Sequence, residues 1–587
     1  MTFAMTRRGV AAALSLLLIG ARPAVAQTMT PADARFADLA KRFLEELLKS
    51  SPIRATTLGD HRFDHQLDDV SAAGRTRALA AARALLKEAE AIPARELSRE
   101  NQVDLAVLKN ALGFQIWSTE VLQDWAWDPQ IYNDLAGSAL YGLMAREFAP
   151  APVRLRAATA RMEALPQLLA QARRELQPAR VPPTHAKTVA RQNAGLMSIV
   201  DDMILPKAGE LSPAEQARLK AAAEKLRTAA AEHQAWLDGT LVPQAKGDFR
   251  LGAKLYDEKL AFALMSPLDR AEVRRRAEAA LKATRARMHE IARKVLADAG
   301  KPAPDGEQAA IEAALELVYA ERAPRDRLVE ASRAALDQAT AFTRAKDLIT
   351  LPDAPVQVIL MPEFQRGFAV AYCDPPGPLD KQLDTFYAVS PIPDEWTEAQ
   401  AESFLREYNV RGLHDVAIHE GVPGHYTQLW HGNKHPSVLR AVLWSGPFVE
   451  GWAVYAEEMM ADAGYLDGDP LFRLQQLKMR IRTITNAILD QMVHVDGADE
   501  AEVMKFLTVT AFQQEREAAG KWVRAQLSSA QLPTYFVGVS EHDELRAEAR
   551  RREGEAFDLK RFHDRLLSFG APPVRYARAL MFDEPIV

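Results

Sequence analysis

Helical periodicity dominates this chain and runs almost unbroken from about residue 31 to about residue 348. Ala, Leu, Arg and Glu recur there at the spacing of amphipathic helices, with charged stripes typical of solvated helix faces. Three helix starts are predicted from an N-cap residue followed by proline or acidic residues: Ser212-Pro213-Ala214-Glu215, Ser266-Pro267-Leu268-Asp269 and Thr397-Glu398-Ala399-Gln400. The sequence therefore predicts an all-α (mainly α) protein with one large helical body.

One segment interrupts this pattern, between Leu351 and Pro393. Prolines cluster there, and residues 356–361, 368–372 and 385–390 are predicted to be short strands. We expect a small β-sheet just ahead of the chemical motif described below. Its edge strand can hold an extended peptide by strand addition, or the strands can form a hairpin that only closes the fold. The pattern leaves both alternatives open.

The first 26 residues have the features of a cleaved export signal. Arg7 and Arg8 supply the positive start, an apolar stretch too short to span a bilayer follows, and Ala24-Val25-Ala26 is a small-residue cleavage site. We therefore expect an exported protein, periplasmic or secreted, with no membrane contact after cleavage. The signal leaves Sec and twin-arginine export open.

The net charge and the cysteine count limit the kinds of partner and of covalent link that this chain can have. The formal net charge is −6, which does not fit a protein that binds nucleic acid. Cys373 is the only cysteine, so no intrachain disulfide can form, and its position argues against a lipid anchor near the signal. After the signal we predict one continuous domain with an N-terminal helical part, 27–348, and a metal-binding catalytic part, 349–587. The oligomeric state does not follow from the sequence.

A short motif around His419, Glu420 and His425 carries the strongest chemical signal. In common zinc peptidases two histidines lie four residues apart on one helical face, and the glutamate beside the first activates water. Here the histidines are six residues apart, and on a regular helix six residues rotate by about 240°, onto another face. A regular helix therefore cannot bring both histidines to one metal ion.

Pro423 and Gly424 suggest how the two histidines can still meet. Pro423 cannot donate a backbone hydrogen bond and would clash with the carbonyl of His419 in a helix, whereas Gly424 permits unusual backbone angles. A widened or broken turn would then return His425 to the metal side. The alternative is a helix that ends at Glu420 and a turn with two incidental histidines. Spacing alone does not decide between them.

A second acidic segment follows 25 residues after His425. Residues 448–457 read as a helix in which Glu450 and Glu457 are seven apart and share a face. A glutamate on a helix is more often a solvated charge, but the apolar neighbours here predict burial, where an unpaired carboxylate is costly. Zinc at a catalytic site takes three protein ligands, which His419, His425 and Glu450 would supply. Glu457 could then hold a ligating histidine from behind, outside the ligand set.

These residues, as His-Glu-x-x-Pro-Gly-His and Glu-Gly-Trp-Ala-x-Tyr-x-Glu, resemble the bacterial family of domain of unknown function 885. That family resembles the helical gluzincin peptidases of the angiotensin-converting-enzyme and thermostable-carboxypeptidase kind. The resemblance implies a helical, zincin-like body with a deep cleft and one Zn²⁺ per chain. It implies His419, His425 and Glu450 as ligands and Glu420 as general base. The family commonly has a second histidine after the last motif histidine, where this chain has Tyr426.

Three further segments resemble family motifs, and each contains a candidate for stabilising the oxyanion that amide hydrolysis develops. Asp490 and His494 are four apart on a predicted helix, with Asp490 in a supporting role. Tyr535 lies in a Gln-Leu-Pro-Thr-Tyr segment, and His563 in a C-terminal Phe-His-Asp segment. We expect Tyr535 first and His494 or His563 second. For each, a packed structural side chain is the alternative.

The predicted function is hydrolysis of peptide bonds, in short peptides if the cleft is deep. An amidase or esterase acting on small molecules would need the same site residues and remains open. A non-catalytic periplasmic binding protein is a third alternative, although a purely structural metal site has no use for Glu420. Sequence does not tell whether cleavage starts from the amino end, the carboxyl end or within the peptide.

Overall fold

Helices form nearly all of the regular structure in the computed structural model, which describes residues 30–362, 366, 370–380 and 382–586. This confirms the predicted mainly α fold class. The export signal predicted at residues 1–26 lies outside the described residues. Among the helices that are described, none combines the length and apolar character needed to cross a bilayer.

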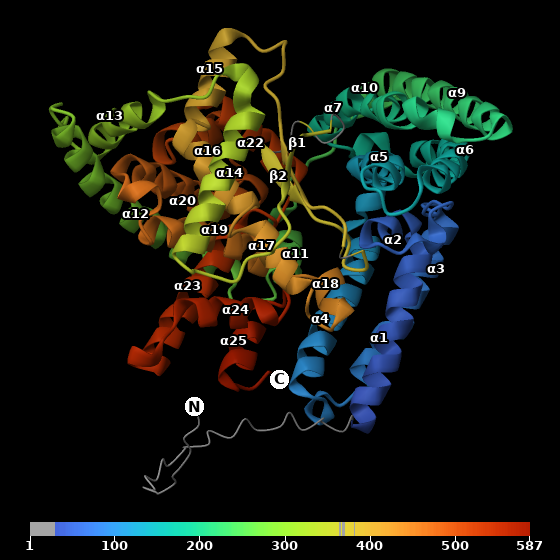
Figure 1. The fold of residues 1–587 in the computed structure, drawn as a ribbon. Helices are drawn as coiled ribbons and strands as arrows, with labels where there is room; N and C mark the ends of the chain where they lie inside the picture. The colour runs from blue at the N-terminus through green and yellow to red at the C-terminus, as the bar shows by residue number, and fades with distance from the viewer. Residues whose placement is uncertain (1–29, 363–365, 367–369, 381, 587) are drawn as a thin grey trace, which may run out of the picture.

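Helices α1 to α10 gather on one side of the molecule, and α12 and α13 lie on the opposite side (Figure 1). The helices of this first part of the chain are α1 (Pro31–Ser50), α2 (Pro52–Leu58), α3 (Ala72–Glu90), α4 (Arg99–Trp117), α5 (Gln130–Met144), α6 (Ala151–Glu175), α7 (Pro183–Gln192), α8 (Gly195–Ile199), α9 (Pro213–Trp236), α10 (Val242–Gln244), α11 (Gly252–Leu264), α12 (Arg270–Asp298), α13 (Glu307–Tyr319) and α14 (Leu328–Ala345).

The second part of the chain supplies the helices that surround the predicted motifs. They are α15 (Glu398–Glu407), α16 (Val410–Glu420), α17 (His425–Gly432), α18 (Val438–Val442), α19 (Gly446–Asp462), α20 (Pro470–Gln491), α21 (Glu500–Lys505), α22 (Glu515–Leu527), α23 (Pro533–Glu553), α24 (Leu559–Ser568) and α25 (Val574–Phe582). Phe448 and Trp452 of α19 are buried in a large apolar cluster with residues of α23 and α24.

Two glycines allow α19 and α23 to pack with their backbones in contact. A Cβ atom on Gly451 would lie 2.3 Å from the carbonyl carbon of Gly538, and one on Gly538 would lie 1.9 Å from the carbonyl oxygen of Pro447. Any larger side chain would push the helices apart. This contact sets the position of α19, which carries Glu450, against α23, which carries Tyr535.

Three short strands form one sheet near the middle of the molecule (Figure 1). They are β1 (Gln357–Leu360), β2 (Ala371–Asp374) and β3 (Phe386–Val389), in the order β1-β3-β2. Strand β3 is central, parallel to β1 and antiparallel to β2. The predicted sheet is confirmed, although the second strand ends later than predicted. Strand β2 is an edge strand, as peptide addition would require.

The predicted helix starts are confirmed at two of three places. Ser212 and Thr397 are the N-caps of α9 and α15, each in a reciprocal capping box. At the third place α12 begins one turn later than predicted, because Asp269 is the N-cap and its carboxylate accepts a first-turn backbone N–H. The hydroxyl of Ser266 instead donates to Glu541, 2.7 Å away.

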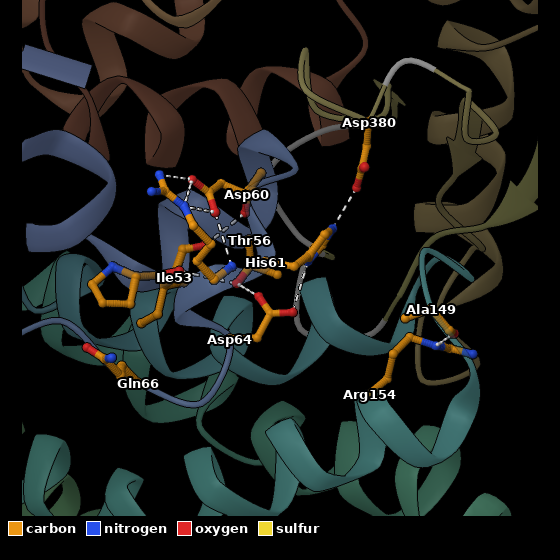
Figure 2. Close-up of polar contacts among 12 residues, drawn as sticks. Ile53, Thr56, Asp60, His61, Asp64, Gln66, Ala149, Arg154 and Asp380 are labelled. Carbon is orange, nitrogen blue, oxygen red and sulfur yellow. Dashed lines mark hydrogen bonds and ion pairs between the residues drawn. The ribbon is translucent and has the colours of Figure 1, made fainter. Parts of the chain in front are cut away.

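Polar contacts join the N-terminal helices to the segment after β2 (Figure 2). The His61 ring lies between two carboxylates, with Nδ1 2.9 Å from Asp64 and Nε2 2.6 Å from Asp380. Arg146, just after α5, donates to the carbonyl oxygen of Asp374 at 2.6 Å and pairs with its carboxylate at 3.0 Å. The contacts of Arg146 hold the end of α5 against the end of β2, and those of His61 join the N-terminal helices to the segment after β2.

Candidate metal centre

A cavity of about 900 Å³ lies between the N-terminal helices and the second part of the chain. Helix α5 borders one side, and the edge strand β2 borders another. The remaining walls come from α16, α17, α19, α20, α22 and α23. His419, Glu420, His425, Glu450 and Tyr535 all line it, so one cavity collects predicted residues from four separate helices.

Three of these residues converge on one point. Ligating atoms of His419, His425 and Glu450 all lie within 4.8 Å of one another. The Nε2 atoms of His419 and His425 lie 3.8 Å and 3.6 Å from Oε2 of Glu450. These separations are too long for hydrogen bonds. They are close to the roughly 3.3 Å that separates ligand atoms around a tetrahedral zinc with bonds near 2.0–2.1 Å. The three donors therefore fit a zinc ion.

The helix break between His419 and His425 produces this convergence. Helix α16 ends at Glu420 and α17 begins at His425, and the broken turn between them brings His425 back to the side of His419 and Glu450. The break packs Gly424 against α16, where an added Cβ would lie 2.0 Å from the carbonyl oxygen of His419. The Trp452 indole of α19 donates to the carbonyl oxygen of Pro423 at 2.9 Å. A glycine and a distant helix thus hold the second histidine in place.

Glu420 lies beside the three donors and is held by the sheet. The backbone N–H of Cys373 in β2 donates to Oε2 of Glu420 at 2.9 Å. Burial raises the pKa of the Glu420 carboxyl, although His425 and His419 oppose this shift. A carboxylate with a raised pKa accepts a proton more readily, which suits a general base.

His419 is supported from behind by a buried carboxylate. Oε1 of Glu457 lies 2.6 Å from Nδ1 of His419, which leaves Nε2 to face Glu450. This contact is the geometry that the predicted supporting role of Glu457 requires. Asp415, one turn before His419 on α16, also lines the cavity, and burial followed by repulsion from Glu457 raises the pKa of its carboxyl. Sequence reasoning missed Asp415, whose only signal was its spacing of four from His419.

Tyr535 projects from α23 into the cavity, with its ring centroid 6.4 Å from that of His419. The phenol oxygen accepts hydrogen bonds from Arg524 at 3.0 Å and from Gln531 at 3.4 Å. Because the oxygen is an acceptor in both, its own proton remains free to donate. Its position therefore suits a donor to a developing oxyanion.

The other predicted residues lie elsewhere in the fold and do not line the cavity. The His494 Nε2–H is shared by the carbonyl oxygens of Ala525 and Ser528, each at 2.8 Å, at the end of α22. His563 donates from Nδ1 to the carbonyl oxygen of Leu348 and accepts from a tyrosine hydroxyl at Nε2. Both histidines are buried, so the oxyanion role predicted for them is not supported by their positions.

Asp490 also makes hydrogen bonds that stabilise the fold. Its carboxylate accepts the hydroxyl of Tyr256 and the backbone N–H of Ala530, each at 2.8 Å, and so fixes the turn that leads to α23. Tyr426, where the family commonly has histidine, donates its hydroxyl to the carbonyl oxygen of Ala354. Burial raises the pKa of the Cys373 thiol well above its usual range, which agrees with an unreactive cysteine.

Fold and site together define a mainly α-helical protein with a candidate His-His-Glu metal centre in a large cavity. The chain belongs to the family described as bacterial protein of unknown function DUF885, whose family model matches residues 52–581. This confirms the family expected from the sequence motifs. No curated protein matches the chain.

Two solved structures share the fold over nearly the whole chain. One is described as a possible lipoprotein of unknown function from Shewanella oneidensis. It is 33% identical with a TM-score of 0.78, and the match covers 93% of this chain and 99% of that one. The other, described as a possible lipoprotein from Colwellia psychrerythraea, is 15% identical with a TM-score of 0.75 and coverage of 94% and 98%. Neither description names an activity.

Proposed function

We propose that this protein is a zinc-dependent hydrolase that cleaves peptide bonds in short peptides. The observation that carries the proposal is the convergence of His419, His425 and Glu450 beside Glu420 in one cavity. Structural zinc sites are closed by four protein ligands, whereas catalytic sites use three. In the described part of the chain, the group of potential ligands has these three members and no fourth.

The residues of the cavity have separate roles in this proposal. His419, His425 and Glu450 would hold the zinc ion, which when bound supplies Lewis acidity and lowers the pKa of water. Glu420 accepts a proton from the attacking water while the new C–O bond forms. It then passes that proton to the nitrogen of the leaving amine as the C–N bond breaks. The Tyr535 hydroxyl donates to the oxyanion.

The edge strand supports a peptide as the substrate. Ala371, Tyr372 and Cys373 of β2 line the cavity, and β2 has a partner strand on one side only. An extended substrate can add to the free side by backbone hydrogen bonds. Because Cys373 N–H already positions Glu420, the same strand would align the peptide bond and the base. A cavity of about 900 Å³ fits a short peptide and excludes a folded protein.

We also propose that the protein is exported. The signal features of residues 1–26 and the lipoprotein descriptions of the two similar structures agree with an exported protein. We place the mature protein in the periplasm or outside the cell. Fractionation of cells that express the full chain tests this, and a signal-retaining cytoplasmic form would contradict it.

The experiment for the activity is Glu420→Gln, which keeps the size of the side chain and removes the base. We expect the variant to retain zinc and to lose turnover by about 10²–10⁴-fold, the usual contribution of a general base. Short peptides, amides and esters are compared as substrates of the wild type. Full activity in the variant would refute the mechanism. Cleavage of esters or amides alone would move the function to an amidase or esterase.

A further inference from the structure

Helix α22 carries three charged side chains on one face, and two of them line the cavity. Glu517, Lys521 and Arg524 follow at spacings of four and three, so they share one face. Lys521 and Arg524 line the cavity, together with Arg482 from α20. Sequence reasoning gave these residues no role, because such spacing is typical of a solvated helix face.

Only one of the three cations has a close carboxylate partner. Arg482 pairs with Glu517 at 2.6 Å. Arg524 donates to Gln531 and to Tyr535, both neutral hydrogen-bond acceptors. Within the described residues, no carboxylate oxygen lies within 4.0 Å of the Lys521 amine or the Arg524 guanidinium. Two basic side chains therefore line the cavity without a direct ion pair to a carboxylate.

Lys521 is buried, with 3% of its surface exposed. Burial lowers the pKa of its amine well below the usual value, repulsion from Arg482 and Arg524 adds to the shift, and attraction to Glu517 and Glu407 only partly opposes it. A buried cation is costly unless it is paired and hydrogen-bonded. An anion entering the cavity would remove this cost and gain charge-assisted hydrogen bonds. The arrangement is that of a binding site for an anionic group.

Arg524 lies close to the proposed catalytic residues, and Lys521 is one turn before it on the same helix face. Arg524 contacts the Tyr535 hydroxyl, and the Tyr535 ring stacks toward His419 at 6.4 Å between centroids. A substrate whose anionic group is bound by Lys521 and Arg524 can therefore also place its scissile bond beside Glu420. The anionic group that every unmodified peptide carries, whatever its sequence, is its terminal carboxylate.

We propose that Lys521 and Arg524 bind the free α-carboxylate of the substrate, so that the enzyme cleaves near the carboxyl end of short peptides. This inference rests on the proposed function and specifies its substrate class. Arg482 stays paired with Glu517 and supports the site from behind. A longer chain threaded through the cavity would offer no carboxylate at this place. Peptides with a blocked carboxyl end are therefore poor substrates.

The test compares N-acetyl-dialanine as the free acid and as the carboxyl-terminal amide. Binding is measured by calorimetry in the Glu420→Gln background, and again with Lys521→Met or Lys521→Arg added. Lys254→Met, on an exposed side chain of α11, is the control for loss of a lysine. We expect the acid to bind at least about 10-fold more tightly than the amide, as a hydrogen-bonded charge predicts. Lys521→Met should abolish this preference, and Lys521→Arg should retain part of it.

Equal binding of acid and amide, or a preference that survives Lys521→Met, would overturn the inference. Equally tight binding of an amide that carries an aspartate side chain would assign the site to side-chain carboxylates and would overturn it too. In the zinc-loaded enzyme, Lys521→Met should raise KM for the free acid at least about 10-fold with little change in kcat. Binding preference without hydrolysis would refute the proposed function alone. Hydrolysis of acid and amide at equal rates would refute this inference alone.

Discussion

Substitution of Glu457 tests whether the carboxylate behind His419 supports a metal ligand. The two groups are 2.6 Å apart, and Glu457 is 4% exposed, so water cannot replace the lost hydrogen bond. Loss of a partner that orients a metal ligand costs about 10–100-fold in metal affinity. Glu457→Gln keeps an acceptor and loses the charge, so we expect about 10-fold weaker zinc binding. Glu457→Ala loses both, and about 100-fold is expected.

The assay is competition for zinc against a chelator of known affinity, followed at fixed pH. Glu458→Gln is the matched control, because Glu458 is on the same helix but pairs with Arg287 and Arg473, away from the histidines. Circular dichroism and urea unfolding of the zinc-free proteins show whether each variant folds. Zinc affinity within twofold of wild type in a folded Glu457→Ala protein would refute the supporting role.

Two further predictions concern the backbone at the helix break and the contact between the two parts of the chain. Gly424→Ala places a methyl group 2.0 Å from the carbonyl oxygen of His419. We expect a loss of about 1–3 kcal/mol in unfolding free energy, measured with urea, together with weaker zinc binding, measured by competition. Unchanged stability and unchanged zinc affinity would contradict the close contact. At His61 burial opposes the charge, but hydrogen bonds to Asp64 and Asp380 raise the pKa above its usual value of 6.5. Protonated His61 therefore stabilises the fold below about pH 6.5, and this contribution is lost as pH rises through the raised folded-state pKa. The stability difference between wild type and His61→Gln, from urea unfolding, should shrink with rising pH; a constant difference would exclude the charged pair.

Local patterns predicted the fold class because the signals that define a helix come from residues close together in the sequence. Periodicity and the caps at Ser212 and Thr397 involve residues a few positions apart, and they placed helices correctly. The start predicted at Ser266 was wrong because a second capping residue, Asp269, follows within one turn and takes the N-cap position. The sheet was predicted from composition, but its strand order depends on contacts that no local pattern contains.

The candidate site was predictable where a motif keeps its chemistry close together in sequence. His419, Glu420 and His425 stood out, yet their convergence depends on a break held by Trp452 from another helix. The position of His563 depends on a carbonyl oxygen 215 residues away in the chain, which spacing cannot reveal.

Charge patterns were the least informative part of the sequence. Lys521 and Arg524 look like a solvated stripe until the cavity wall is known. The same spacing occurs on exposed helices such as α12, where it does place charges in water. Burial, which is a tertiary property, separates the two cases.

The zinc content of the purified mature protein, wild type beside His425→Ala, tests the central claim most directly. His425 is the ligand that the helix break alone brings into place. The account predicts about one zinc per wild-type chain and a folded variant that has lost it, because two remaining ligands bind zinc weakly. A wild type without zinc, or zinc retained undiminished in the variant, would contradict the metal centre.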